Sequence, residues 1–426
     1  MSGSPLESHV STYSRPTDLR ITDLRVVNLK ALPFDVSLLR IDTNQGISGY
    51  GEVRDGASPT YALLLKSRLL GENPCNIDKI FRVIKQFGFH GRQGGGVCGI
   101  EMALFDLAGK AYGVPAYQLA GGKFRDKALI YCDTDSVPDG AVMGQRLKAR
   151  MEDGFKFLKM DIGIGLLKGI EGAISAPPQV DVARHIMHPL RGIQLTELGI
   201  DVLVEYVRQV RDIIGYEVPL AADHFGFINV ESCIRLGQAL DQFSLAWYED
   251  MIPWQLTEQW LRLKRSVLTP VCTGEDIYLK EGFMPLLAAQ AVSVIHPDLA
   301  TSGGIMETKK IGDLAQDYGI PMAMHFAGSP VSFLANIHCA AATENFYVLE
   351  NHSVDLPWWE DLIDGIDKPL IVDGYARVPE GPGLGFGDLN EEVIRERMDM
   401  RKGRDAGYFE PTEAWDDETS WDHLWS

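Results

Sequence analysis

Long apolar runs, paired cysteines and an excess of basic residues are all missing from this sequence. No apolar run reaches the roughly 18 residues that a membrane-spanning helix needs, so we expect no insertion into a bilayer. Lys and Arg number 40 against 59 Asp and Glu, and the net charge of −19 argues against binding nucleic acid or an anionic membrane through bulk charge. The composition, 45% hydrophobic and 23% charged, is close to the globular average and excludes disordered and fibrous classes.

The cysteines and the N-terminal segment both indicate a protein of the reduced cytoplasm. No CxxC or CxH pair occurs, so neither a zinc knuckle nor a disulfide framework is predicted. Residues 1–17 are polar and Ser-rich and lack the apolar core of a secretory signal. The six cysteines are Cys75, Cys98, Cys132, Cys233, Cys272 and Cys339.

Eight short apolar runs follow one another from about residue 128 onward. Each run ends in a polar residue and is followed by a helical stretch. Runs that are apolar throughout, instead of at every second position, are typical of parallel strands buried on both faces. The runs are residues 128–133 (ALIYCD), 155–161 (FKFLKMD), 219–223 (PLAAD), 244–249 (SLAWYE), 270–275 (PVCTGE), 292–298 (VSVIHPD), 321–325 (PMAMH) and 347–350 (YVLE).

The polar residues that end the last six runs lie at regular distances along the chain. Successive ends are 26, 26, 23, 27 and 25 residues apart, which is about the length of one strand–helix unit. Eight such units close into a (β/α)8 barrel, in which the side chains at the C-terminal ends of the strands face one active site. These ends are Asp223, Glu249, Glu275, Asp298, His325 and Glu350.

The rest of the chain divides around this barrel. The 64 residues from Lys159 to Asp223 exceed one strand–helix unit, so we expect a long lid at about 163–198 over the mouth of the barrel. Trp415, Trp421 and Trp425 in the last stretch favour a tail that docks on its own or a neighbouring subunit. The predicted units are a polar tail (1–17), an α+β capping domain (18–127), the barrel (128–366) and a C-terminal return to the capping domain with the Trp-bearing tail (367–426).

Three of the strand-end residues are carboxylates at equal spacing, namely Asp223, Glu249 and Glu275. In a barrel they would converge at one rim, where three like charges need a cation to neutralise them. Oxygen ligands that leave room for water favour Mg²⁺ over zinc or copper, so we predict one Mg²⁺ per subunit. The alternative is that each residue is an ordinary strand-end or helix-capping carboxylate. That alternative is disfavoured because all three residues stand at the same position, directly after an apolar strand.

Asp298, His325 and Glu350 end the next three strands. A carboxylate beside a histidine fixes the tautomer of the ring and raises its basicity. We therefore predict that His325, oriented by Asp298, is a general base. Glu350 would face the metal across the barrel, where it could donate a hydrogen bond to a developing enolate if its pKa were raised.

Four segments resemble motifs of one known family: residues 99–122 (GIEMALFDLAGKAYGVPAYQLAGG), 247–253 (WYEDMIP), 298–304 (DLATSGG) and 340–350 (AAATENFYVLE). Over nearly its whole length the chain resembles the enolase superfamily, in the mandelate racemase subgroup. The resemblance implies a modified, enolase-type barrel with a capping domain. It also implies the three carboxylates as Mg²⁺ ligands, the Asp298–His325 pair as the catalytic dyad and Glu350 as the electrophile.

One position departs from the pattern of that subgroup, which usually carries Lys-x-Lys at the end of the second strand. Here the residues are Lys159, Met160 and Asp161. Lys159 matches the lysine that neutralises the substrate carboxylate, and Asp161 stands where the second base belongs. Aspartate is about six pK units less basic than lysine, which disfavours two-base racemisation. Lys156 is a candidate in another alignment, and Asp161 could simply pair with Lys159.

With His325 as the strong base, we predict dehydration of a sugar acid to a 2-keto-3-deoxy acid. His325 would remove the α-proton and then protonate the departing β-hydroxyl on the same face. Cap loops at 32–34 and 54–58 would close over the distal end of the substrate, as the family implies. The candidate substrate contacts are Asp161, His224, Tyr131, Arg184, His185 and His188, of which the lid residues are equally typical of a solvated surface.

Two rival functions remain open at this stage. The first is an epimerase, racemase or cycloisomerase of an acid sugar, or of its lactone or anhydro form, through the same enolate. The second is a non-catalytic barrel kept for binding or assembly. The expected partner is a small-molecule carboxylate, with no nucleic acid and no membrane, and the family commonly forms symmetric assemblies, so we expect a homo-oligomer.

Overall fold

The computed structural model describes residues 15–30, 32–88, 91–177, 192–223, 228–401 and 405–417. Its N-terminal part is an antiparallel sheet in the order β1-β2-β3, with helices packed against it. Helix α3 can lie very close to β3 because a Cβ on Gly51 would stand only 2.0 Å from the carbonyl oxygen of Gly99. The elements are β1 (Ile21–Leu29), β2 (Val36–Thr43), β3 (Gly49–Val53), α1 (Thr60–Leu63), α2 (Ile77–Ile84), α3 (Gly94–Tyr112) and α4 (Ala116–Leu119), with 3₁₀ turns at Pro16–Asp18, Lys66–Arg68, Lys85–Gly88 and Gly91–Gln93.

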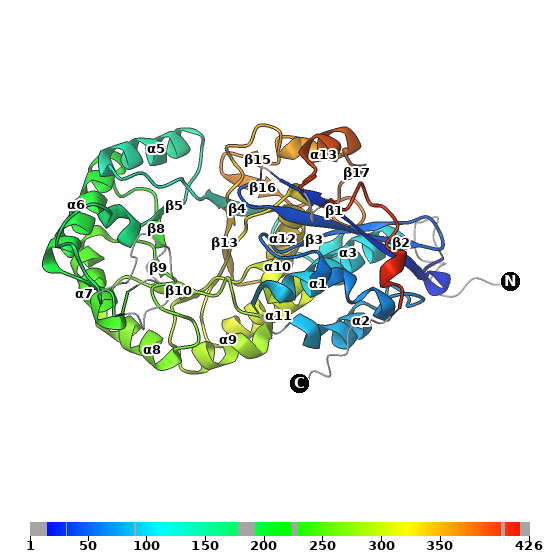
Figure 1. Cartoon of the computed structure of the whole chain (residues 1–426), viewed down its shortest axis with the longest axis horizontal. Helices are drawn as coiled ribbons and strands as arrows, with labels where there is room; N and C mark the ends of the chain where they lie inside the picture. Colours follow the sequence, from blue (N-terminus) through cyan, green and yellow to red (C-terminus); the bar gives the residue numbers. More distant parts are fainter. Residues whose placement is uncertain are drawn as a thin grey trace.

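The predicted barrel of eight parallel strands is confirmed. The strands follow in the order β4-β5-β8-β9-β10-β11-β12-β13, and pairing of β13 with β4 closes the ring. Figure 1 shows the barrel beside the N-terminal sheet, with helices α5 to α9 around its outside. The strands are β4 (Lys127–Cys132), β5 (Leu158–Asp161), β8 (Leu220–Asp223), β9 (Tyr248–Glu249), β10 (Val271–Thr273), β11 (Val294–Ile295), β12 (Met322–Met324) and β13 (Phe346–Asn351).

Helices cover the outside of the barrel after each of the first seven strands. Several begin with a side chain that accepts a backbone N–H, such as Thr196 before α6 and Ser329 before α12. The eighth strand is followed by a 3₁₀ turn at Glu360–Leu362 and short strands in place of an α-helix. The helices are α5 (Gly140–Glu152), α6 (Glu197–Ile214), α7 (Val230–Leu240), α8 (Thr257–Ser266), α9 (Leu279–Ala288), α10 (Leu299–Ser302), α11 (Gly304–Asp317) and α12 (Pro330–Ala342).

The inside of the barrel is filled by side chains, so it is a packed core and not a pore. A separate hydrophobic cluster takes one buried residue from each of the eight strand segments, and Trp247 is its largest member. This layer forms a dry floor beneath the C-terminal ends of the strands. Its members are Tyr131, Phe157, Ala221, Trp247, Cys272, Val294, Ala323 and Val348.

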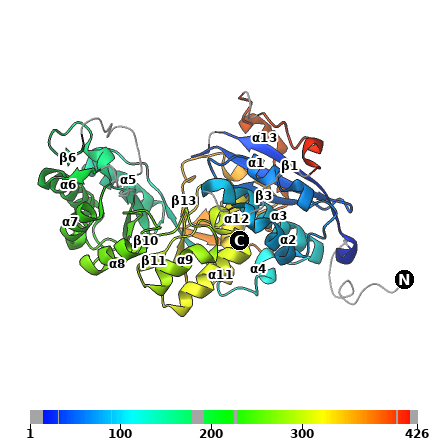
Figure 2. The ribbon, with the colours of Figure 1, turned by 60° about the horizontal axis from the view of Figure 1, so that its bottom comes forward.

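The C-terminal segment touches both the barrel and the N-terminal part. A hairpin of β15 (Ile371–Val372) and β16 (Tyr375–Arg377) adds to barrel strand β4, and β14 (Ile363–Asp364) pairs with β17 (Asp388–Leu389). Helix α13 (Glu391–Arg397) then leads to a bridge between Met398 and Leu29 of β1, and Figure 2 shows α13 above the N-terminal sheet. The predicted boundaries of the capping domain, 18–127 and 367–426, stay a proposal.

The two remaining sequence expectations concern the tail and the lid. Trp415, in the 3₁₀ turn Glu413–Trp415, is half-buried against the main core, whereas Trp421 and Trp425 lie outside the described residues. In the segment 163–198, which was expected to form a lid, the described residues form a 3₁₀ turn at Ile164–Leu167 and a two-stranded ladder of β6 (Ile174–Ser175) and β7 (Gln194–Leu195). Among the residues described, no helix combines the length and apolar character that crossing a membrane requires.

Candidate active site

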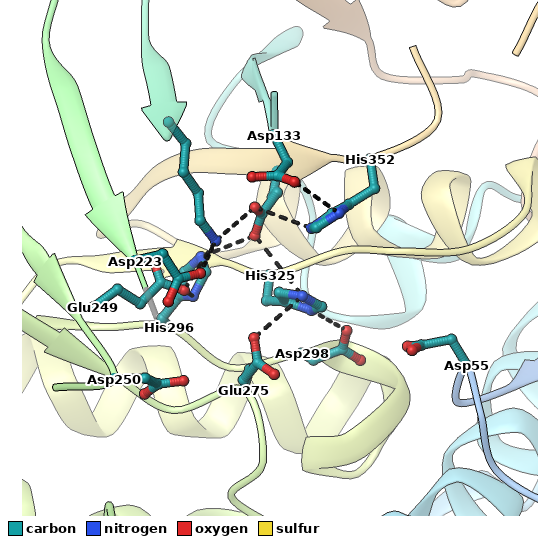
Figure 3. Close-up of polar contacts among 12 residues, drawn as sticks. Asp55, Asp133, Asp223, Glu249, Asp250, Glu275, His296, Asp298, His325 and His352 are labelled. Carbon is teal, nitrogen blue, oxygen red and sulfur yellow. Dashed lines mark hydrogen bonds and ion pairs between the residues drawn. The ribbon is translucent and has the colours of Figure 1, made fainter. Parts of the chain in front are cut away.

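Charged side chains from seven strand ends converge above the floor of the barrel (Figure 3). Six of them are the in-phase residues that the spacing singled out, and the seventh is Lys159 of β5. All of these side chains except that of Glu275, which is 16% exposed, are more than 90% buried. Ionised groups this deeply buried must neutralise one another or hold a ligand.

Lys159 lies at the centre of the carboxylate cluster. Its Nζ is 2.6 Å from Asp223 Oδ2, 3.2 Å from Glu249 Oε1 and 2.8 Å from Glu350 Oε1. Burial lowers the pKa of Lys159, but these three charges raise it by more, so the pKa lies well above its usual value. Lys156 is not part of the site, because its Nζ lies 5.0 Å from the ring of Tyr375 in the added hairpin.

The donor set fits a hard divalent cation. Asp223, Glu249 and Asp250 offer oxygens that all lie within 4.8 Å of one another. Burial and the neighbouring carboxylates Glu275, Asp223 and Glu249 raise the pKa of Asp250 well above its usual value, which shows how much negative charge meets here. Oxygen ligands of this kind suit Mg²⁺ and similar cations.

Glu275 occupies a different position from the other two predicted metal ligands. Its Oε2 lies 3.2 Å from Nε2 of His325, and its Oε1 lies 3.5 Å from Nη2 of Arg54. Burial raises the pKa of Glu275 to about 7, Arg54 opposes the shift, and Asp223 is among the charges that add to it. The described structure therefore places Glu275 between the carboxylate cluster and His325, with Asp250 beside Asp223 and Glu249.

The Asp298–His325 dyad is formed as a direct contact. Nδ1 of His325 is 2.7 Å from Oδ2 of Asp298, while Oδ1 of Asp298 accepts the backbone N–H of Ala300 at 2.7 Å as the N-cap of α10. With both carboxylate oxygens engaged, the ring is held with Nε2 toward the cavity. Burial and the nearby guanidinium of Arg54 lower the pKa of His325 well below its usual value.

Arg54 comes from the N-terminal part, where it begins the loop 54–58 that was expected over the distal end of the substrate, and its contact with the dyad was not predicted. It follows β3 directly, is 1% exposed, donates to Asp298 and lies 2.9 Å from Nδ1 of His325. Its place is fixed by α3, because a Cβ on Gly95 would stand 2.5 Å from Cβ of Arg54. The N-terminal part of the chain thus contributes a charge to the dyad itself.

We expect Arg54→Gln to destabilise the fold and to raise the pH at which His325 becomes available as a base. Loss of one partner of a buried ion pair leaves Asp298 uncompensated, at a cost of about 3–5 kcal/mol in the free energy of unfolding. Because Arg54 lowers the pKa of His325, its loss raises that pKa, and the acid limb of the kcat/KM profile moves to higher pH. Denaturant titration and a pH profile measure the two effects.

Arg54→Lys and Arg82→Gln serve as controls for this experiment. The lysine keeps the positive charge and should restore most of the pH profile, and the side chain of Arg82 on α2 is 68% exposed and far from the dyad in the chain. An unchanged pH profile in Arg54→Gln would show that Arg54 has only a structural function.

A second histidine–aspartate pair, formed by His352 and Asp133, was not predicted from the sequence. Nδ1 of His352 lies 3.3 Å from Oδ2 of Asp133, and Nε2 lies 3.1 Å from Oε1 of Glu350. Burial lowers the pKa of His352, but Asp133 and Glu350 raise it by more, to about 9. The shift is opposite in direction to that of His325, whose ring centroid is 5.4 Å away.

Glu350 does not meet the condition for a hydrogen-bond donor. Burial raises its pKa, but Lys159 and His352 lower it by more, so the pKa lies well below its usual value and the side chain is ionised. In this arrangement Glu350 forms ion pairs with Lys159 and His352 and holds both side chains in place.

His296 is a third residue that sequence reasoning missed. Its Nδ1 lies 2.8 Å from Glu249 Oε1 and its Nε2 lies 2.8 Å from the hydroxyl of Tyr131. Trp247 donates to the other oxygen of Glu249 at 2.8 Å. Tyr131 is completely buried, so it supports His296 from the floor and offers no surface to a substrate.

The other predicted substrate contacts are only partly visible. Asp161 shares a strand face with Lys159 and pairs in register with Asp223, so the end of β5 carries the Lys-x-Asp pattern as expected. His224, Arg184, His185 and His188 lie outside the described residues.

Three of the residues that were not predicted share one sequence signal, a spacing of two from a residue already singled out. His296 stands two before Asp298, His352 two after Glu350, and Asp133 two after Tyr131. Side chains two apart on a strand point to the same face, so each of these strand ends presents two layers of polar groups to the cavity. Arg54 has no such signal, because it reaches the site from another domain.

Comparison with known proteins agrees with this architecture. Residues 142–393 match the family described as enolase C-terminal domain-like, and residues 30–121 match the mandelate racemase / muconate lactonizing enzyme N-terminal domain. The chain belongs to the enolase superfamily. Within it, the chain is 36% identical over 85% of its length to the D-xylonate dehydratase of Haloferax volcanii, of which it covers 85%. It is 28% identical over 86% of its length to the D-galactonate dehydratase of Ralstonia pickettii, of which it covers 92%.

Solved structures of the superfamily share the fold. A mandelate racemase/muconate lactonizing enzyme-like protein from Rubrobacter xylanophilus superposes with a TM-score of 0.80 and 29% identity, covering 90% of this chain and 98% of that one. A member of the enolase superfamily from Salmonella Typhimurium gives a TM-score of 0.76 and 26% identity, covering 89% and 98%.

Proposed function

We propose that the protein is a sugar-acid dehydratase that converts an aldonate to a 2-keto-3-deoxy acid. The observation that carries the proposal is the dyad of His325 and Asp298, which stands as a poised base at the rim while Asp161 replaces the second lysine on β5. A single histidine base in that position, without a second lysine opposite it, favours elimination over two-base racemisation. The names of the relatives from Haloferax volcanii and Ralstonia pickettii point to the same reaction class.

The residues proposed to hold one Mg²⁺ per subunit are Asp223, Glu249 and Glu275, with Asp250 beside them. When bound, the cation supplies positive charge next to the substrate carboxylate, where negative charge develops on loss of the α-proton. Lys159 adds a fixed positive charge at the same place.

His325 removes the proton from C2 of the substrate, and the electron pair of that C–H bond passes into an enediolate. The enediolate then expels the hydroxyl group from C3, which leaves as water once it has gained a proton. The enol that remains takes a proton at C3, loses the proton of its C2 hydroxyl and becomes the 2-keto acid. Asp298 holds the imidazolium form of His325 during these steps, and the buried surroundings keep bulk water away from the reacting carbons.

A panel of sugar acids tests the proposal. The purified protein with Mg²⁺ is incubated with aldonates that include D-xylonate and D-galactonate, and formation of 2-keto acid is measured. We expect at least one five- or six-carbon aldonate to be converted. Exchange of the C2 proton in D₂O without keto acid would instead indicate an isomerase, and neither exchange nor product from any acid would indicate a non-catalytic barrel.

We also propose a homo-oligomer in the cytoplasm, which rests on the sequence and family resemblance alone. Light scattering of the purified protein measures the assembly size directly.

A further inference from the structure

We propose that His352, held by Asp133, is the general acid that protonates the departing C3 hydroxyl, so that proton removal and leaving-group protonation are divided between two histidines. The inference rests on the proposed dehydration and refines it. It replaces the simpler scheme in which His325 performs both transfers.

The pairing of β13 with β4 builds this second site. These two strands close the barrel, with Glu350 opposite Tyr131 and Asn351 opposite Cys132 in the register. The residues that follow, His352 and Asp133, are therefore brought together although 219 positions (352 − 133) separate them in the chain. In Figure 3 both point into the same space as His325.

His352 has an orientation suited to a substrate contact. Asp133 faces Nδ1 at 3.3 Å, and Nε2 lies 3.1 Å from Oε1 of Glu350 on β13. The side chain is 16% exposed, against 7% for His325, so it borders the open part of the site. Phe34 of the cap lies over the ring with centroids 6.3 Å apart.

Both histidines contact two carboxylates, but only His325 also contacts an arginine. His325 lies against Asp298, Glu275 and the guanidinium of Arg54. His352 lies between Asp133 and Glu350. The other titratable groups that face His352 are Lys159 on β5 and His325 on β12. Two histidine–aspartate pairs side by side at one rim can supply a base and an acid to the same substrate.

The two rings lie beside each other and face the same carboxylate. Their centroids are 5.4 Å apart, and the Nε2 atoms of His325 and His352 lie 4.0 Å and 3.1 Å from the two oxygens of Glu350. C2 and C3 of an aldonate are joined by a single bond of about 1.5 Å, so a substrate lying alongside both rings can present its C2 proton to one and its C3 hydroxyl to the other.

The number of protons on the two histidines is the same before and after one turnover. His325 takes the C2 proton, His352 gives its proton to the C3 oxygen, the C3–O bond breaks and water leaves. In the tautomerisation that follows, the proton on His325 passes to C3, and the proton of the enol hydroxyl returns to His352, directly or through water. Both histidines end in their starting forms without a further reactant.

His352→Asn separates the two proton transfers. We expect C2 proton exchange in D₂O to stay within about threefold of wild type, while keto acid formation falls about 10²–10⁴-fold. A 3-deoxy-3-fluoro aldonate loses fluoride, which needs no proton, so the variant should convert the fluoro acid at nearly the wild-type rate. Equal losses with the hydroxy and fluoro acids, or full activity with the hydroxy acid, would overturn the assignment.

Asp133→Asn provides a second measurement if His352→Asn does not fold. Removal of the Asp133 charge lowers the pKa of His352, so the basic limb of the pH profile should move to lower pH, and an unmoved limb would contradict the assignment. Asp355→Asn is the matched control, because Asp355 pairs with Arg150 at the surface with a side chain that is 67% exposed. Wild-type protein that converts no sugar acid would overturn the dehydratase proposal itself, which distinguishes the two failures.

Discussion

His325→Asn is expected to reduce keto acid formation by about 10³–10⁴-fold, because it removes the base that takes the C2 proton. Nδ1 of His325 contacts Asp298 at 2.7 Å, and an asparagine amide can still donate to that carboxylate, so the fold around α10 should survive. The variant should also lose C2 proton exchange in D₂O. Steady-state turnover and NMR exchange measure the two effects.

Loss of C2 proton exchange distinguishes His325→Asn from His352→Asn, because the His352 variant should still exchange the C2 proton. Thermal unfolding and Mg²⁺ affinity serve as controls, and both should stay close to wild type. An Asn variant that still exchanges the C2 proton at the wild-type rate would show that another group is the base, and the assignment of the dyad would be wrong.

The layout of the barrel was predictable because it depends on local sequence. Fully apolar runs identify buried parallel strands, and a polar residue at the end of each run marks the C-terminal rim. The convergence of Asp223, Glu249, Asp298 and His325 at one place follows from that phase alone. It needs no knowledge of which side chains touch.

The individual contacts were not predictable, because they depend on packing between distant segments. Arg54 meets Asp298 only because α3 fixes the end of β3 against the rim. The ionised state of Glu350 depends on Lys159 and His352 together, and neither distance can be read from the sequence. His352 and His296 carried a usable signal, the spacing of two from a rim residue, which doubles the number of polar positions to consider at each strand end.

Removal of the divalent cation is expected to lower turnover by at least about 10³-fold, because its charge contributes several kcal/mol at the developing enediolate. Treatment with a chelator followed by Mg²⁺ should remove and restore the activity. Asp223→Asn should weaken Mg²⁺ binding by at least about 100-fold, since even residues that only support metal ligands change affinity by 10- to 100-fold. Calorimetry of Mg²⁺ binding measures this without reference to turnover.

The third carboxylate ligand is decided by a matched pair of variants. Glu275→Gln should weaken Mg²⁺ binding as strongly as Asp223→Asn, whereas Asp250→Asn should have a smaller effect because Thr273 already donates to Asp250. The reverse order would assign the position to Asp250, whose oxygens lie with those of Asp223 and Glu249. Glu275 would then act on His325, from which its Oε2 is 3.2 Å away, and its loss would alter the pH profile more than the metal affinity.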